Sequence, residues 1–122
     1  MNRLVLDDLQ RRRAYPSVTV LLDTEPGPSL ADADRATIAR LLATVDRRLD
    51  GGVTDAVRSR LLTDLDELVA QIAGEPTSVA LALFASPEHT AVVRLGRAVE
   101  ERVVVDETFA TRDLVADLNR TA

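Results

Sequence analysis

The segment RRLDGGVTDAVRSR, residues 47–60, separates two long stretches of helical periodicity. Before it, apolar residues recur at spacings of three and four: Ile38, Leu41, Leu42, Val45 and Leu49. After it, the same period continues in Val57, Leu61, Leu65, Leu68 and Ile72. This spacing predicts two amphipathic helices, over 31–49 and 54–73. Because the link between them is very short, they are expected to form an antiparallel αα-hairpin.

The link itself is most simply interpreted as a turn. Gly51 and Gly52 follow a helix and no Lys comes after them, whereas a phosphate-binding glycine loop follows a strand and opens a helix. We therefore expect a left-handed helix end, with a positive φ at one of the two glycines in a solvent-exposed link. Thr54 is expected to cap the second helix, and Ser29 or Asp32 the first.

Strand-like segments lie on both sides of the hairpin. Residues 3–14 are typical of a short helix that ends at Tyr15-Pro16, and the β-branched run 17–23 is typical of a buried strand. Gly74 is expected to end the second hairpin helix as a left-handed cap. Three further strand segments follow: 78–84, 89–95 and 102–105. A last helix ends the chain.

The order is therefore helix, strand, two helices, three strands and helix. It predicts a single domain over residues 1–122, of the α/β (α+β) class. We expect a mixed central sheet of about four strands, with the long antiparallel helical hairpin and further helices packed on it.

The composition excludes several classes of function. The chain carries a net charge of −5, and its fifteen basic residues are all Arg. A compact acidic domain is a poor general binder of nucleic acid, because affinity scales with the number of neutralised phosphates, so no DNA partner is expected. There is no Cys, and no apolar run approaches a membrane span, so we expect neither disulfides nor a membrane partner. Acids interrupt the N-terminal segment too early for a signal peptide, and a cytoplasmic location is expected.

No catalytic pattern is visible among the polar residues. His89 is the sole histidine, and no Ser or Cys nucleophile signature accompanies it. Asp23, at the end of a buried strand, is the acid best placed for chemistry but has no identifiable partner. The spacing of the acids is not that of metal ligands. We therefore expect no enzymatic activity, no cofactor and no metal.

Arginines on both sides of the link allow two interpretations. Arg47 and Arg48 end the first helix, where cations complement the helix dipole, and Arg58 can pair with nearby acids. Alternatively, Arg47, Arg48 and Arg58 gather at an exposed tip, where an acidic domain could meet RNA phosphate. Both interpretations stay open on the residues alone.

Two segments carry a resemblance to a known family: YPSVTVLLDT (15–24) and SVALALFASPEHTAVVRLGRAVEERVVVDETFATRDLVADLN (78–119). They resemble the N-terminal domain of bacterial and archaeal relatives of the archaeo-eukaryotic peptide-chain release factor and Pelota family. The resemblance implies one domain of a longer, three-domain protein that enters the ribosomal A site. It also implies that the hairpin tip reaches the decoding centre. The expected RNA-binding residues at this tip are Arg47, Arg48, Asp50, Gly51, Gly52, Thr54 and Arg58.

The chain also departs from that family. Its tip lacks the Asn-Ile-Lys-Ser type motif of release factors, and Gly51-Gly52-Val53 does not replace the Gly-Gly-Gln motif of their middle domain. The departures favour a role in ribosome rescue or dormancy over reading of stop codons. The expected partner is the ribosome and its RNA, bound through the full-length protein. The alternative is a non-catalytic interaction domain with no RNA role, which self-associates as a homo-oligomer through a sheet edge or the hairpin.

Overall fold

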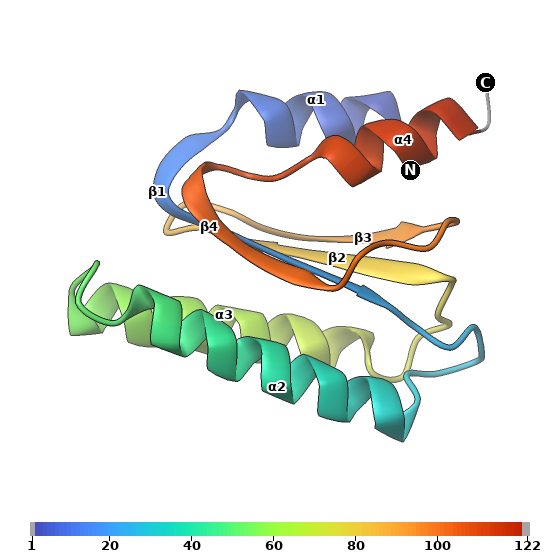
Figure 1. The fold of residues 1–122 in the computed structure, drawn as a ribbon, viewed down its shortest axis with the longest axis horizontal. Helices are drawn as coiled ribbons and strands as arrows, with labels where there is room; N and C mark the ends of the chain where they lie inside the picture. The colour runs from blue at the N-terminus through green and yellow to red at the C-terminus, as the bar shows by residue number, and fades with distance from the viewer. Residues whose placement is uncertain (1, 121–122) are drawn as a thin grey trace.

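The computed structural model of this chain describes residues 2–120 and has an α+β fold, as the sequence predicts. Its elements are α1 (Arg3–Arg11), β1 (Arg13–Asp23), α2 (Asp32–Leu49), α3 (Asp55–Ile72), β2 (Ala80–Ala85), β3 (Thr90–Leu95), β4 (Arg102–Thr108) and α4 (Arg112–Arg120). The four strands form one sheet, in the order β3-β2-β1-β4. Figure 1 shows three layers, with α2 and α3 on one face of the sheet and α1 and α4 on the other.

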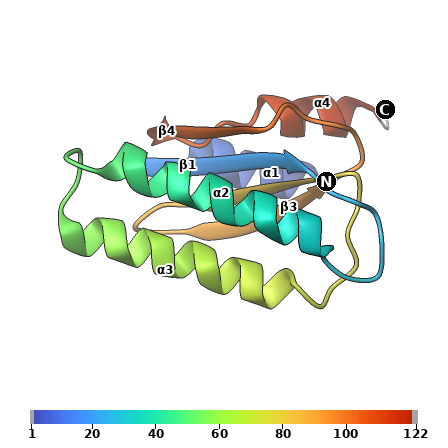
Figure 2. The same cartoon turned by 60° about the horizontal axis from the view of Figure 1, so that its bottom comes forward.

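The sheet is antiparallel throughout, so the expectation of a mixed sheet is wrong. The connection between β1 and β2 explains the difference. It consists of two helices that lie side by side and run in opposite directions, so the chain returns to the end of the sheet that it left (Figure 2). The next strand must then run antiparallel to β1. A single crossover helix would have produced a parallel pair.

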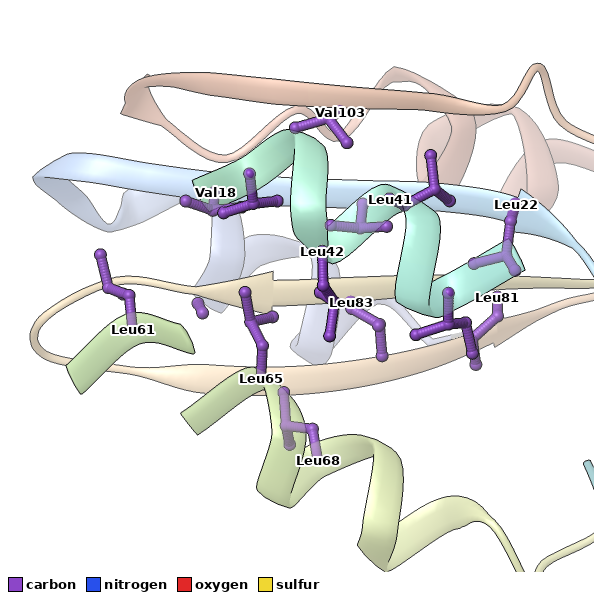
Figure 3. Packing of buried hydrophobic residues seen from close by; sticks show 14 of the residues in the cluster. Val18, Leu22, Leu41, Leu42, Leu61, Leu65, Leu68, Leu81, Leu83 and Val103 are labelled. Atoms are coloured by element: carbon purple, nitrogen blue, oxygen red, sulfur yellow. The ribbon is translucent and has the colours of Figure 1, made fainter. Parts of the chain in front are cut away.

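Both faces of the sheet are buried, and the central strands supply both cores. Side chains alternate along β1, so that Val18 and Val20 face the hairpin while Leu21 faces α1 and α4. The predicted hairpin stripes are buried, except that Val57 is only half-buried. Figure 3 shows leucines of α2 and α3 packed together against Leu81 and Leu83 of β2.

The helix ends differ from expectation at two places, the start of α2 and the end of α3. Thr54 caps α3 as predicted, because its Oγ1 accepts a hydrogen bond from the N–H of Val57. Neither Ser29 nor Asp32 caps α2, whose N-cap is Ala31 without a side-chain bond. The Asp34 carboxylate instead accepts a bond from the Glu25 N–H, which fixes the preceding loop.

The end of α3 is also not the predicted left-handed cap. Within residues 2–120, Gly51 is the only residue with a positive φ, so Gly74 does not adopt that conformation. The final carbonyls of α3 are satisfied by other groups: Ala73 O accepts from the Leu30 N–H at 3.1 Å, and Ile72 O from the Glu75 N–H at 3.0 Å. These bonds remove the need for a left-handed residue.

The first helix is shorter than predicted. It ends at Arg11, and β1 begins at Arg13 rather than at Ser17. Pro16, which follows a cis peptide bond, lies where the pairing with β4 shifts register between Arg13 and Ser17. Because Pro has no N–H to donate, such an irregularity is a place where a strand tolerates it.

Candidate functional site

The α2–α3 link forms the exposed tip of the hairpin. Figures 1 and 2 both show it beyond the end of the sheet. Gly51 has a φ of 77°, as predicted for one of the two glycines, and no atom lies within 4 Å of where its Cβ would be. The N–H of Gly52 bonds to Leu49 O at 3.1 Å, which closes the turn. The link is exposed except for Val53, which packs against the core.

An ion-pair bridge braces the two helices beside the link. Arg58 of α3 donates from Nε to Asp46 Oδ1 at 2.5 Å and from Nη1 to Asp50 Oδ1 at 2.8 Å. Asp46 belongs to α2 and Asp50 to the link, so one guanidinium holds three segments of chain. The hydrogen bond to Asp46 raises the pKa of Arg58. Arg58 therefore fixes the shape of the tip.

The other two arginines of the predicted site have different partners. Arg48 donates from Nη1 to the carbonyl oxygen of Val103 in β4. Arg47 is exposed, and its Nη2 donates to Thr44 Oγ1 one turn earlier in α2, at 3.0 Å. The structure thus brings Arg58 together with two acids and directs Arg48 to the sheet. Among the described residues, 2–120, Arg47 is the guanidinium of the three that has no partner outside its own helix.

Tyr15 is a neighbour of the tip that the sequence reasoning did not identify. A Cβ on Gly52 would lie 3.5 Å from the Tyr15 hydroxyl, so the ring of this β1 residue reaches the link. The side chain is 56% exposed. No local pattern marks this contact, because the residues are far apart in the chain. The contact of Arg48 with β4 is likewise invisible in the sequence.

The remaining polar candidates have structural partners. Asp23 Oδ1 accepts the Val99 N–H at 2.8 Å, which holds the connection before β4. His89, directly before β3, places its Nε2 3.6 Å from Oδ2 of Asp8 in α1. Burial lowers the pKa of His89, and the nearby Arg12 lowers it further, while Asp8 opposes both.

Among residues 2–120, no group of three or more His, Cys, Asp or Glu side chains is placed to hold a metal ion. None of the helices in the same range has the length and apolar character required to cross a bilayer.

Comparisons with known proteins place the chain in no family. No family model matches it, and a search of curated proteins found no match.

Proposed function

We propose that this chain is a ribosome-associated module of a translation factor, with a role in rescue, dormancy or a termination-like step. In this proposal the α2–α3 tip meets ribosomal RNA. The order of elements agrees with the fold that the resemblance to the release factor and Pelota family implies. This agreement supports the proposal on the level of fold, and the tip supplies the more specific support.

One observation carries the proposal: the tip is exposed and is also braced. The Asp46–Arg58–Asp50 bridge, the Thr54 cap and the left-handed Gly51 hold the link in one conformation. An exposed loop that is already ordered loses less conformational entropy on binding than a flexible one. Gly51 also leaves the backbone uncovered, so an RNA strand can approach it closely.

Arg47 is the proposed phosphate contact. Its guanidinium is exposed beside the link, whereas Arg48 and Arg58 are engaged by Val103 and by the two acids. The net charge of −5 opposes general attraction to RNA, so binding must depend on a few local contacts. We therefore assign Arg47 to contact and Arg58 to positioning of the tip.

The test is co-sedimentation of the full-length gene product with ribosomes across a salt series. Arg47→Ala should weaken binding by about 1 kcal/mol, or about fivefold, and reduce the dependence of log K on log salt by about one. Arg58→Ala should weaken it further, because Asp46 and Asp50 are then unpaired negative charges beside the RNA. Arg11→Ala is the matched control, since Arg11 is an exposed helix-end arginine of α1 that also pairs within its helix.

Two results would contradict the proposal at different levels. If wild type binds but neither tip variant weakens binding, the tip is not the contact, although ribosome association stands. If wild type does not sediment with translating, stalled or dormant ribosomes, the function itself is wrong.

A further inference from the structure

The two outer edges of the sheet are β3 and β4. Hydrogen bonds at the strand ends show which groups point outward. Ser86 and His89 form a hydrogen-bonded pair at the β2–β3 turn, since the N–H of each donates to the carbonyl oxygen of the other. At the other end of β2, the Thr24 N–H, just after β1, donates to Val79 O. Because hydrogen-bonded pairs alternate along antiparallel strands, the backbone groups of Thr90, Val92 and Arg94 face away from β2.

The outer side of β4 follows from the Thr24–Val79 bond by the same alternation. The backbone groups of Val103, Val105 and Glu107 face away from β1.

The β4 edge is protected against pairing with another strand. Arg48 of α2 occupies the carbonyl of Val103, and Arg40 forms a salt bridge of 2.8 Å with Glu101 just before the strand. The strand also carries Asp106 and Glu107 near its end. Charged side chains and a covering helix are the means by which natural sheets prevent pairing at an edge.

Within residues 2–120, no side chain bonds to an outward backbone group of β3, in contrast to Arg48 on β4. The sequence of β3 is TAVVRL, in which Arg94 is the single charged residue. The Arg94 guanidinium is held away by Glu75 Oε2 at 2.6 Å and Pro76 O at 3.0 Å. Within residues 2–120, the outward backbone groups of Thr90, Val92 and Arg94 have no hydrogen-bond partner. This strand can therefore accept another one.

An apolar groove follows the same edge. One part, of about 450 Å³, is lined by Leu4, Val5, Leu9, Ala91 and Val92, among others. The next part, of about 260 Å³, lies between Asn2, Val5 and the stretch 92–94. Leu4 is 82% exposed and Val5 37% exposed, although both are large apolar residues. The groove thus offers an extended strand a place for its side chains as well as its backbone.

We propose that a second copy of this chain occupies the β3 edge, in antiparallel pairing about a two-fold axis at Val92. Thr90, Val92 and Arg94 then pair with Arg94, Val92 and Thr90 of the other copy, and all their outward groups are satisfied. The pairing joins the two four-stranded sheets into one. Val5 lines both parts of the groove beside Val92, so α1 of each copy meets the other near the axis.

Self-pairing is favoured by charge as well as by register. With the axis at Val92, Arg94 lies opposite Thr90 of the second copy rather than opposite another Arg94. The surface around Thr90 includes Glu88, which is of opposite charge to Arg94, and Asp64, which pairs with Arg60 of the same helix. Residues 90, 92 and 94 of both copies also share the sheet face that the hairpin covers, so the hairpin face and the α1/α4 face each continue across the junction.

This inference does not rest on the proposed ribosomal role. The edge lies along β3 and α1, whereas the tip lies at the end of the hairpin beyond the sheet (Figure 1). Variants of the edge and of the tip can therefore be tested separately.

The experiment is sedimentation equilibrium of the chain from about 1 to about 500 μM. Wild type should dimerise within this range. Val92→Pro removes an outward N–H without removing a bond to β2, and should weaken dimerisation at least about tenfold. Val105→Pro makes the same change on the β4 edge and should leave it unchanged. Leu4→Lys should weaken it to a similar degree through the groove, and Ala39→Lys on the outer side of α2 serves as its control.

Circular dichroism is to be measured on each variant to test whether it is folded. Leu4→Lys alters an exposed side chain, so it keeps the test decisive even where Val92→Pro unfolds the chain. A wild type that is monomeric throughout the range would overturn the proposal. A dimer that persists in Leu4→Lys and in folded Val92→Pro would show that another surface is used. A wild type that stays monomeric and instead takes up a different extended segment would also exclude a second copy as the occupant.

Discussion

The two faces of the sheet are covered by helices of very different length. On one face α2 and α3 have 18 residues each, and they pack on one another as well as on the sheet. On the other, α1 and α4 have nine residues each. Helices of fewer than about 12 residues are marginal in water, so α1 and α4 depend on the sheet for their stability. The two hairpin helices, in contrast, also support one another, so we expect the hairpin to be the more rigid face and able to carry an exposed tip.

The smaller core is compensated by aromatic packing. The chain contains two Phe residues, and both lie on the α1/α4 face. Phe84 of β2 and Phe109, just after β4, meet edge to face with ring centroids 5.3 Å apart. Such a pair adds attraction beyond the area that it buries. The short helices therefore cover a well-packed core, while their own attachment is limited to a few side chains.

The largest expected effect comes from one leucine on each face. Leu65→Ala in α3 and Leu9→Ala in α1 should each lower the free energy of unfolding by about 3 kcal/mol if unfolding is global, since both leucines are almost completely buried. The pattern of amide exchange should differ. Leu65→Ala should speed exchange across all strands, whereas Leu9→Ala should act first on α1, which can detach locally.

Native-state hydrogen exchange, read residue by residue, measures this difference. Equal acceleration over the whole molecule in both variants would show that the faces unfold as one unit. The distinction between a rigid hairpin and dependent short helices would then be wrong.

Much of this contrast follows from the sequence, but the arrangement of the strands does not. The period of the apolar residues predicts the hairpin helices and their buried stripes. A buried strand such as β2, apolar on both faces, looks the same whether its neighbour is parallel or antiparallel, which is why a mixed sheet was predicted. The direction of β2 depends on how many helices lie between β1 and β2, and the two predicted helices already imply an antiparallel pair. The strand order β3-β2-β1-β4, in contrast, depends on contacts between distant segments.

The site was predictable to a similar extent. The proximity of Arg58 to acids follows from local spacing across a short link, and Gly51 follows from the turn. The partner of Arg48 does not, because it depends on which sheet edge α2 covers. Long-range contacts of this kind decide which arginine is left for a partner, and they make Arg47 the candidate.

A smaller effect is expected at the α2–α3 link, the exposed tip of the hairpin. Gly51→Val should destabilise the chain by roughly 1 kcal/mol or more, because a β-branched residue resists the left-handed conformation that Gly51 adopts. Gly52→Val is the matched control. It has no positive φ, and its Cβ would meet Tyr15 Oη at an ordinary contact distance of 3.5 Å. Thermal or urea unfolding measures both. Equal loss in the two variants would show that backbone conformation at Gly51 is not the cause.

The smallest expected effect concerns the face covered by the short helices α1 and α4, where His89 and Arg12 lie beside Asp8 of α1. The pKa of His89 is lowered from 6.5, first by burial and then by Arg12. The unfolded chain therefore takes up this proton at a higher pH than the folded one. The free energy of unfolding should therefore fall as pH drops through about 6.5 toward the pKa of His89 in the folded chain. The pKa of Asp8 is also lowered, mainly by its hydrogen bond to Arg12, so the stability from Asp8 is lost separately, as pH falls below about 3.8.

Because His89 is the sole histidine, its imidazole signals can be titrated without ambiguity by NMR. Arg12→Ala should raise the His89 pKa, because it removes a neighbouring positive charge, and Asp8→Asn should lower it, because it removes the opposing attraction. His89→Gln should abolish the loss of stability that begins as pH falls through about 6.5, while leaving the loss below about 3.8 in place. If the His89 pKa in the folded chain lies at or above that in the unfolded chain, burial does not govern this residue. Acid would then strengthen the contact between α1 and the β2–β3 turn, and the short-helix face would be held in part by an ion pair.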